Sequence, residues 1–126
     1  MRTIIAGSRT TRDPYLIDRA IEQAKLIGIT PTIVLSGGQK TWDRDLRRYI
    51  GADYLGELWA IAKGIPIERY RAQWSIYGKS AGPRRNVDMI ENSEALIAIW
   101  DGKTRGTSHV IREAMARGRL VHIEYF

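Results

Sequence analysis

The 126-residue sequence contains no cysteine, only two histidines, and no apolar run long enough to span a membrane. Without cysteine the chain can form neither a disulfide framework nor a thiolate zinc site. The first residues read as a strand rather than as the apolar core of a signal peptide. We therefore expect a cytoplasmic protein that has no metal, no cofactor and no contact with a membrane.

The chain is basic and moderately apolar. Hydrophobic residues make up 44% of the chain, and the formal net charge is +6. This apolar content is enough to bury one core in a chain of this length. We predict a single domain that spans residues 1–126.

Apolar runs alternate with amphipathic helical patterns along the whole chain. The runs predict strands at residues 3–6, 32–35, 65–70, 95–100 and 120–125. The first predicted helix begins at Asp13-Pro14, where an N-cap precedes a proline at the first helical position. The second ends at Gly64, the third begins at about Pro83, and the fourth begins near Thr107. This alternation predicts an α/β fold, a Rossmann-like domain of three layers.

Strand composition predicts the strand order. The runs at 3–6, 32–35 and 95–100 are continuously apolar, which is typical of strands covered on both faces. The runs at 65–70 and 120–125 include polar residues, and the first of them contains a proline, so both belong at the edges. With right-handed crossovers, the five parallel strands take the order 3-2-1-4-5, with helices on both faces. The ligand crevice of such a sheet lies where the winding reverses, between the first and fourth strands.

The segments that follow the predicted strands are strongly basic. Residues 7–12, 37–50, 71–85 and 101–106 together carry twelve Lys and Arg but only three Asp. Their sum of +9 exceeds the +6 of the whole chain. Because parallel strands end at one edge of a sheet, this charge predicts an anionic ligand there. A solvated basic rim is the alternative interpretation.

Glycine, serine and arginine recur in these segments, in combinations that suit phosphate. Glycine lets a ligand approach the backbone, helix-terminal amides and serine hydroxyls bind phosphate oxygens, and arginine binds them bidentately. Turns and helix caps are the alternative explanation for the same residues. The predicted ligand-binding residues are Gly7, Ser8, Arg9, Ser36, Gly37, Gly38, Asp53, Arg84, Arg85, Asn86, Asp101, Gly102, Gly106 and Thr107.

Several segments together resemble one known family. They are residues 1–9 (MRTIIAGSR), 35–38 (LSGG) with 51–53 (GAD), 77–86 (YGKSAGPRRN), and 100–102 (WDG) with 106–107 (GT). In this order they resemble the small stand-alone branch of the SLOG superfamily, which is named after DprA/Smf and the LOG phosphoribohydrolases. The resemblance implies a Rossmann-like fold that binds nucleotides or nucleotide-derived molecules, including signals of prokaryotic and phage conflict systems. It also implies a homodimer or higher oligomer, to which Trp59 and Met89 would contribute.

The chain departs from that family at two places. A basic loop is inserted at about residues 39–50, and it is either a lid that stacks on a base or a disordered or partner-binding segment. The LOG motif has a glutamate three residues after its threonine, where this chain has Val110. LOG-type hydrolysis is therefore not implied by the resemblance.

Two carboxylates remain as catalytic candidates. Asp53 and Glu57 lie one helical turn apart, so they face the same way. They would supply acid–base chemistry, or they would cap the helix and offset its dipole. The main hypothesis is a sensor or sequestering protein that binds a nucleotide or a nucleotide-derived signalling molecule. The alternatives are a hydrolase or transferase acting on a nucleotide's N-glycosidic or phosphate bond and, third, a protein that binds single-stranded nucleic acid.

Overall fold

A computed structural model describes the whole chain, residues 1–126. Strands and helices alternate along it, apart from one pair of consecutive short strands and a short irregular helical stretch. The elements are β1 (Arg2–Gly7), α1 (Pro14–Lys25), β2 (Ile33–Ser36), β3 (Thr41–Asp43), β4 (Arg48–Ile50), α2 (Ala52–Lys63), β5 (Ile67–Arg69), α3 (Trp74–Tyr77), the 3₁₀ turn η1 (Gly78–Ser80), α4 (Ala81–Glu91), β6 (Ala95–Trp100), α5 (Arg105–Ala116) and β7 (Leu120–Tyr125).

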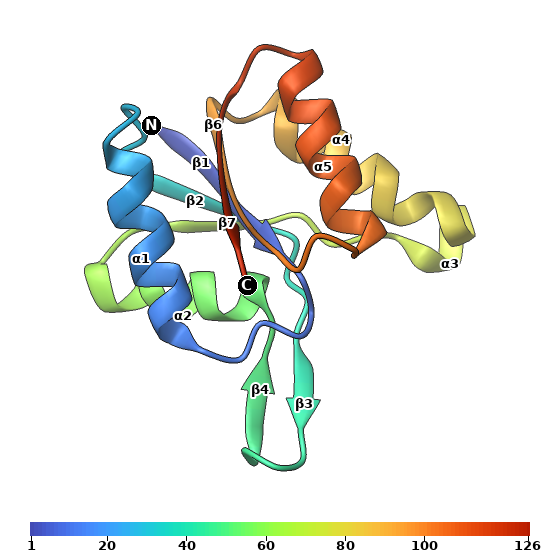
Figure 1. Cartoon of the computed structure of the whole chain (residues 1–126). Coiled ribbons are helices and arrows are strands. Elements are labelled where there is room, and N and C mark those ends of the chain that lie inside the picture. The colour runs from blue at the N-terminus through green and yellow to red at the C-terminus, as the bar shows by residue number, and fades with distance from the viewer.

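Five strands form one parallel sheet in the order β5-β2-β1-β6-β7. Counting only these strands, the order is the predicted 3-2-1-4-5, so the fold prediction is confirmed. Helices α1 and α2 lie on one face of the sheet, and α4 and α5 lie on the other (Figure 1). None of the helices combines the length and the apolar composition that a membrane span requires.

The core consists of two apolar layers, one on each side of the central strands. Ile5 and Ile97 pack into the layer under α1 and α2. Ile4 and Leu96, the preceding residues of the same strands, pack into the layer under α4 and α5. Successive residues of a strand face opposite sides, so strands covered on both faces must be apolar at every position. This requirement explains the continuous apolar runs of β1 and β6.

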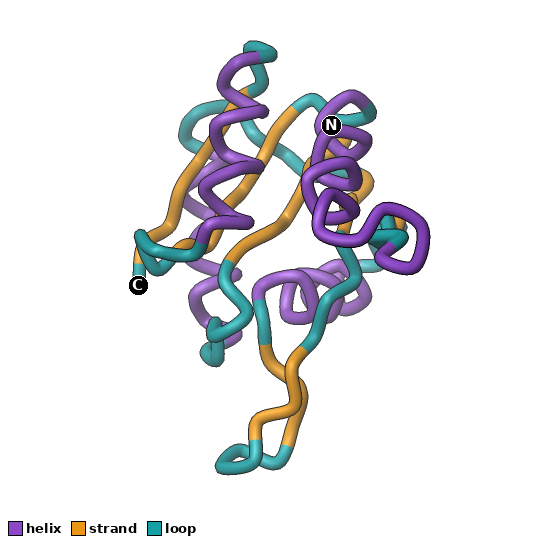
Figure 2. The backbone as a smooth tube through the Cα atoms, turned by 90° about the vertical axis from the view of Figure 1, so that its right-hand side faces the viewer, coloured by secondary structure: helices purple, strands orange, loops and turns teal.

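The segment predicted as an inserted loop at 39–50 is an antiparallel hairpin of β3 and β4. Trp42 and Tyr49 are paired across it and make an edge-to-face contact, with ring centroids 5.1 Å apart. The ammonium group of Lys40 lies 4.2 Å from the centre of the Tyr49 ring. The hairpin projects away from the sheet and its helices rather than folding back over them (Figures 1 and 2). In this structure it is therefore an ordered arm and does not close the crevice as a lid.

Other predicted boundaries shift by a few residues, and one assignment was wrong. The third predicted strand shortens to β5, which begins just after Pro66. The third predicted helix begins at Ala81 rather than at Pro83, and α3 and η1 precede it. The last helix begins at Arg105, two residues earlier than predicted. Met89 is only 1% exposed and belongs to the core, so it cannot take part in the pairing of two copies as predicted.

Candidate anion-binding crevice

A cavity of about 600 Å³ lies at the carboxyl ends of β1, β2 and β6. We call it the central cavity. It lies at the predicted edge of the sheet, but toward α4 and α5 rather than against Asp101. The residues that line it are Ala6, Gly7, Arg9, Gly37, Gln39, Asp53, Trp74, Gly82, Pro83, Arg85, Asn86, Met89, Thr104, Arg105, Gly106, Thr107, His109, Val110 and Arg112.

The first turn of α5 supplies backbone donors to the central cavity. Thr104 occupies the N-cap position, but no side chain caps this helix. The N–H groups of a first turn have no partner within the helix, and the helix dipole adds partial positive charge. Thr107 is only 4% exposed, and its hydroxyl has no hydrogen-bond partner in the protein although the residue lines the cavity. The arrangement is suited to binding phosphate.

Four arginines line the same cavity, and only one carboxylate does. The side chains of Arg9, Arg105 and Arg112 have no hydrogen bond or ion pair with any other residue. The fourth, Arg85, is partly buried and donates to the Gly37 carbonyl oxygen at 3.0 Å and to Asn86 Oδ1 at 2.9 Å. The excess of guanidinium groups makes the cavity strongly electropositive.

The carboxyl group in the cavity belongs to Asp53. Its Oδ2 accepts a hydrogen bond from the Gln39 backbone amide at 3.2 Å. Burial raises the pKa of Asp53 to about 6, although this amide and the neighbouring Arg85 both favour the ionised form. A carboxyl group that titrates near neutral pH is suited to acid–base chemistry.

At Gly37 the side chains of Asp53 and Arg85 approach the backbone closely. A Cβ atom at this position would lie 2.6 Å from Arg85 Nη1 and 2.8 Å from Asp53 Oδ2. Gly7 is more strongly constrained, because a Cβ there would lie 2.0 Å from the backbone carbonyl oxygen of Ile99, which cannot move aside as a side chain can. Both glycines were predicted as places for a ligand to approach, and both also let protein atoms come close.

Glu57, the other catalytic candidate, does not line the central cavity. It is 8% exposed, and its Oε2 accepts a 2.6 Å hydrogen bond from the Ser36 hydroxyl. Its Oε1 accepts from Arg69 Nη2 at 2.7 Å and from Nε at 2.9 Å. Ser36 Oγ in turn accepts the Gly38 amide at 3.0 Å. Glu57, Ser36 and Gly38 therefore hold the loop after β2, and of the two catalytic candidates only Asp53 lines the central cavity.

Ser8 and Asp101 hold the loop after β6. Ser8 is fully buried, and its Oγ donates to Thr104 Oγ1 and accepts the Asp101 amide, both at 3.2 Å. Asp101 Oδ1 accepts the amides of Lys103 and Thr104 at 2.8 Å, and Oδ2 accepts the Thr104 hydroxyl at 2.8 Å. The backbone hydrogen bonds from Thr104 and Lys103 lower the pKa of Asp101 to about 2. Neither residue, nor Gly102, lines the central cavity.

Asn86 and Arg84 both belong to α4, but their side chains reach different cavities. Asn86 is buried and contacts both Arg85 and His109, with its Nδ2 3.2 Å from His109 Nδ1. Arg84 lies over the Tyr77 ring at 4.4 Å and lines a neighbouring cavity of about 580 Å³. We call this the outer cavity. Arg84 thus lies outside the central cavity, and among the predicted ligand-binding residues it shares the outer cavity only with Arg85, which lines both.

Several cavity residues were missed by the sequence-based site prediction. Arg105, His109 and Arg112 lie at i, i+4 and i+7 on α5, and this spacing puts them on one face of the helix. The spacing was a detectable signal. Trp74 offered an aromatic ring that could stack on a base, but aromatic residues near strand ends usually serve packing. Gln39 carried no signal, because its place depends on how the segment around residue 39 folds.

Val110, at the position of the LOG glutamate, lines the central cavity as an apolar side chain. No cluster of His, Asp and Glu in the structure has an arrangement that would hold a metal ion.

Comparisons with known proteins agree with this architecture. No family model matches the chain. The chain is 28% identical over 123 residues to the Gene 61 protein of Mycobacterium phage D29, covering 93% of this chain and 90% of that protein. Its structure is similar to that of DNA processing protein A (DprA) from Streptococcus pneumoniae, with a TM-score of 0.62, 16% identity and 95% of this chain covered. The match covers 48% of DprA, so this chain spans about half its length. The chain therefore has a Rossmann-like fold similar to that of DprA.

Proposed function

We propose that the central cavity binds a nucleotide or a nucleotide-derived signalling molecule, and that the protein acts as a sensor or sequestering protein. One observation carries the proposal: unpaired arginines, the uncapped first turn of α5 and the unpartnered Thr107 hydroxyl all border one cavity. In this account a phosphate group binds at Gly106 and Thr107, with Arg9 and Arg105 as its counter-charges.

The size and surroundings of the cavity support a nucleotide over a free inorganic anion. At about 600 Å³ it falls within the usual range for small-molecule sites. Trp74 is half-exposed at its border and offers an aromatic face on which a base can stack. In this account Asp53, which lines the cavity, accepts hydrogen bonds from ribose hydroxyls. The DprA-like fold and the SLOG-like motifs favour the same ligand class.

The experiment is a panel of adenine and guanine nucleotides, including cyclic forms and ADP-ribose, screened by thermal shift and measured by calorimetry. At least one should raise the melting temperature and bind with measurable heat. Arg9→Ala should weaken that binding. Arg44→Ala is the matched control, because Arg44 is also exposed and unpaired but belongs to the hairpin. The proposal fails when no nucleotide in the panel binds, or when both variants behave alike.

A hydrolase or transferase is the second candidate, because Asp53 lies in the cavity with a pKa of about 6. In this case Asp53 would take a proton from the attacking group, or give one to the leaving group, as the N-glycosidic or phosphate bond breaks. Incubation with nucleoside monophosphates or NAD-like substrates should then release base or phosphate. Asp53→Asn should abolish release without lowering the melting temperature. Absence of turnover in the wild-type protein rejects this candidate and leaves the binding proposal intact.

A further inference from the structure

The outer cavity adjoins the central cavity, and the two are of nearly equal size. The volumes are about 580 and 600 Å³, and Pro83, Arg85 and His109 line both. A ligand that binds in one cavity therefore ends next to the other. The function proposed above uses only the central cavity and leaves the outer one without a role.

Helix α3 contributes one aromatic side chain to each cavity. Trp74 lines the central cavity and is 50% exposed, whereas Tyr77 lines the outer cavity and is 43% exposed. Helix α3, which carries both, has no buried residue, so these rings do not serve the core. The Trp74 ring nonetheless packs closely against Gly82, where an added Cβ would lie only 3.2 Å from the ring. Two half-exposed rings at adjacent cavities suit two stacked bases.

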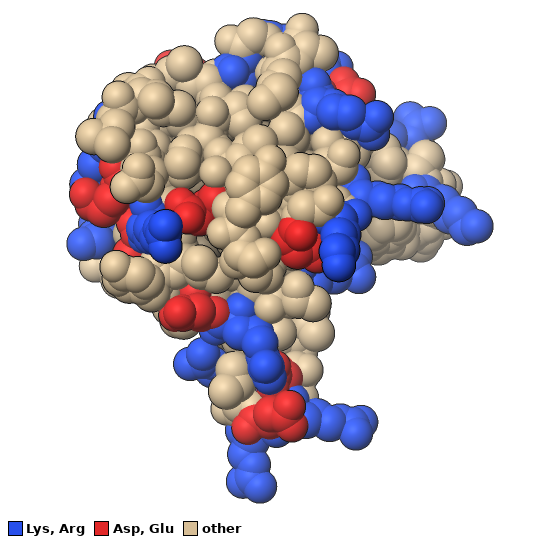
Figure 3. Space-filling model, viewed as in Figure 1, with Lys and Arg blue, Asp and Glu red and all other residues tan.

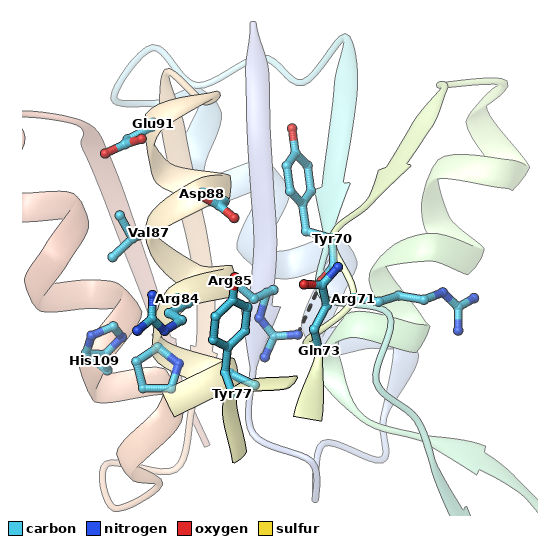
Figure 4. Close-up of a pocket in the computed structure, with 12 residues that line it drawn as sticks. Tyr70, Arg71, Gln73, Tyr77, Arg84, Arg85, Val87, Asp88, Glu91 and His109 are labelled. Atoms are coloured by element: carbon cyan, nitrogen blue, oxygen red, sulfur yellow. Dashed lines mark hydrogen bonds between the residues drawn. The ribbon is translucent and has the colours of Figure 1, made fainter. Parts of the chain in front are cut away.

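The outer cavity also has a basic end and an acidic end. Figure 4 shows Tyr77, Arg84 and His109 close together at one end, whereas Asp88 and Glu91 lie farther along α4. Neither carboxylate is in an ion pair. An acidic end disfavours a phosphate but accepts hydrogen bonds from ribose hydroxyls and from amino groups of a base. The central cavity, with its four arginines, has no comparable acidic end.

We infer that the outer cavity binds a second nucleoside, so that the ligand contains two nucleotides joined by a phosphodiester. The inference rests on the proposed function of the central cavity. One base stacks on Trp74 and the other on Tyr77, and Arg85, which borders both cavities, lies beside the linking phosphate. The ligand is then either a free dinucleotide or two adjacent nucleotides of a single strand.

Calorimetry with 5′-phosphorylated adenylates of one, two and three nucleotides tests this inference. The dinucleotide should bind about tenfold more tightly than the mononucleotide, because stacking one more base typically has an effect of this order. Tyr77→Ala should remove this gain and leave the affinity for the mononucleotide unchanged. Ile76→Ala is the matched control, since Ile76 is 68% exposed in the same helix and lines neither cavity.

The possible outcomes separate this inference from the function on which it depends. If the mononucleotide binds and the dinucleotide binds no more tightly, the second subsite is disproved and the proposed function stands. If none of the adenylates binds, and guanylates of the same lengths do not bind either, this inference fails, and the proposed function fails with it when the cyclic nucleotides and ADP-ribose of the panel do not bind. A gain that stops at two nucleotides supports a free dinucleotide, whereas a further gain at three supports a strand. An equal loss in Tyr77→Ala and Ile76→Ala would overturn the assignment of Tyr77.

Discussion

The loop after β6 and the arginine-lined wall of the central cavity lie next to each other but differ in how their polar groups are paired. At the loop, Asp101 and Ser8, which follows β1, direct their hydrogen bonds to other groups of the protein. Along the wall, Arg9, Arg105 and Arg112 have no partner in the protein. The polar residues that follow the strands thus divide into those that hold the loops and those whose side chains have no partner in the protein. Figure 3 shows that Lys and Arg also gather on the hairpin and along one side of the molecule.

Removing two unpaired arginines of the wall should have the largest effect on binding. Arg9→Ala combined with Arg105→Ala should weaken nucleotide binding about 100-fold or more, because each charged hydrogen bond contributes about 1.5–3 kcal/mol. The melting temperature should not fall, since neither side chain has a partner to lose. Calorimetry and thermal unfolding of the same samples measure both effects. A large loss of stability with unchanged affinity would contradict the division between residues that hold the loops and residues that are unpaired.

Removing a group that is hydrogen-bonded within the protein should instead lower the stability of the protein. Ser8→Ala leaves the Asp101 amide and the Thr104 hydroxyl each without one buried partner. We expect a loss of about 1–3 kcal/mol in the free energy of unfolding. Urea denaturation measures it, with Ser75→Ala as a control because Ser75 is exposed and makes no hydrogen bond through its side chain. Equal stability of the two variants would show that Ser8 is not a structural residue.

The fold was largely predictable from the sequence, because β1, β2 and β6 must be apolar on both faces. The hairpin was not, because β3 and β4 have three residues each and lie in a polar segment. For the candidate site, the sequence predicted that the segments after the strands meet at one edge of the sheet, and the central cavity lies at that edge. The sequence did not separate Ser8 from Arg9, because the partner of Ser8 is Thr104, which is 96 residues away. Which polar groups pair within a protein depends on such distant contacts.

A change of pH should have a moderate effect on nucleotide affinity, because Asp53 is the one carboxylate among the arginines of the central cavity. Its pKa is raised to about 6, so the group is mostly neutral at pH 5 and mostly charged at pH 7. The new negative charge opposes an anionic ligand, and affinity should fall as pH rises between these values. A nucleoside cyclic monophosphate is the suitable probe, since its own charge is constant over this range. Asp53→Asn should remove the dependence, and its persistence in that variant would assign the titration to another group.

The smallest effect on mononucleotide binding is expected from the hairpin. Arg44→Ala combined with Arg47→Ala removes two exposed, unpaired charges, as in the double variant of the wall, but from residues that do not line the central cavity. Mononucleotide affinity should stay within about twofold, because exposed charges at a distance are screened by salt. A single-stranded 20-mer should be bound more weakly by this variant if the hairpin contacts nucleic acid. A loss of mononucleotide binding as large as that caused by the wall variant would place the site on the hairpin.

The most direct test of the central claim is a titration of ¹⁵N-labelled protein with the tightest-binding nucleotide of the panel, followed through backbone amide shifts. Gly106 and Thr107 should show the largest changes, with Gly7 and Gly37 next, because these residues border the cavity. Gly64 and Gly118 end α2 and follow α5, and neither lines either cavity, so their amides should not move. Changes confined to the hairpin, with Gly106 and Thr107 unaffected, would contradict the account.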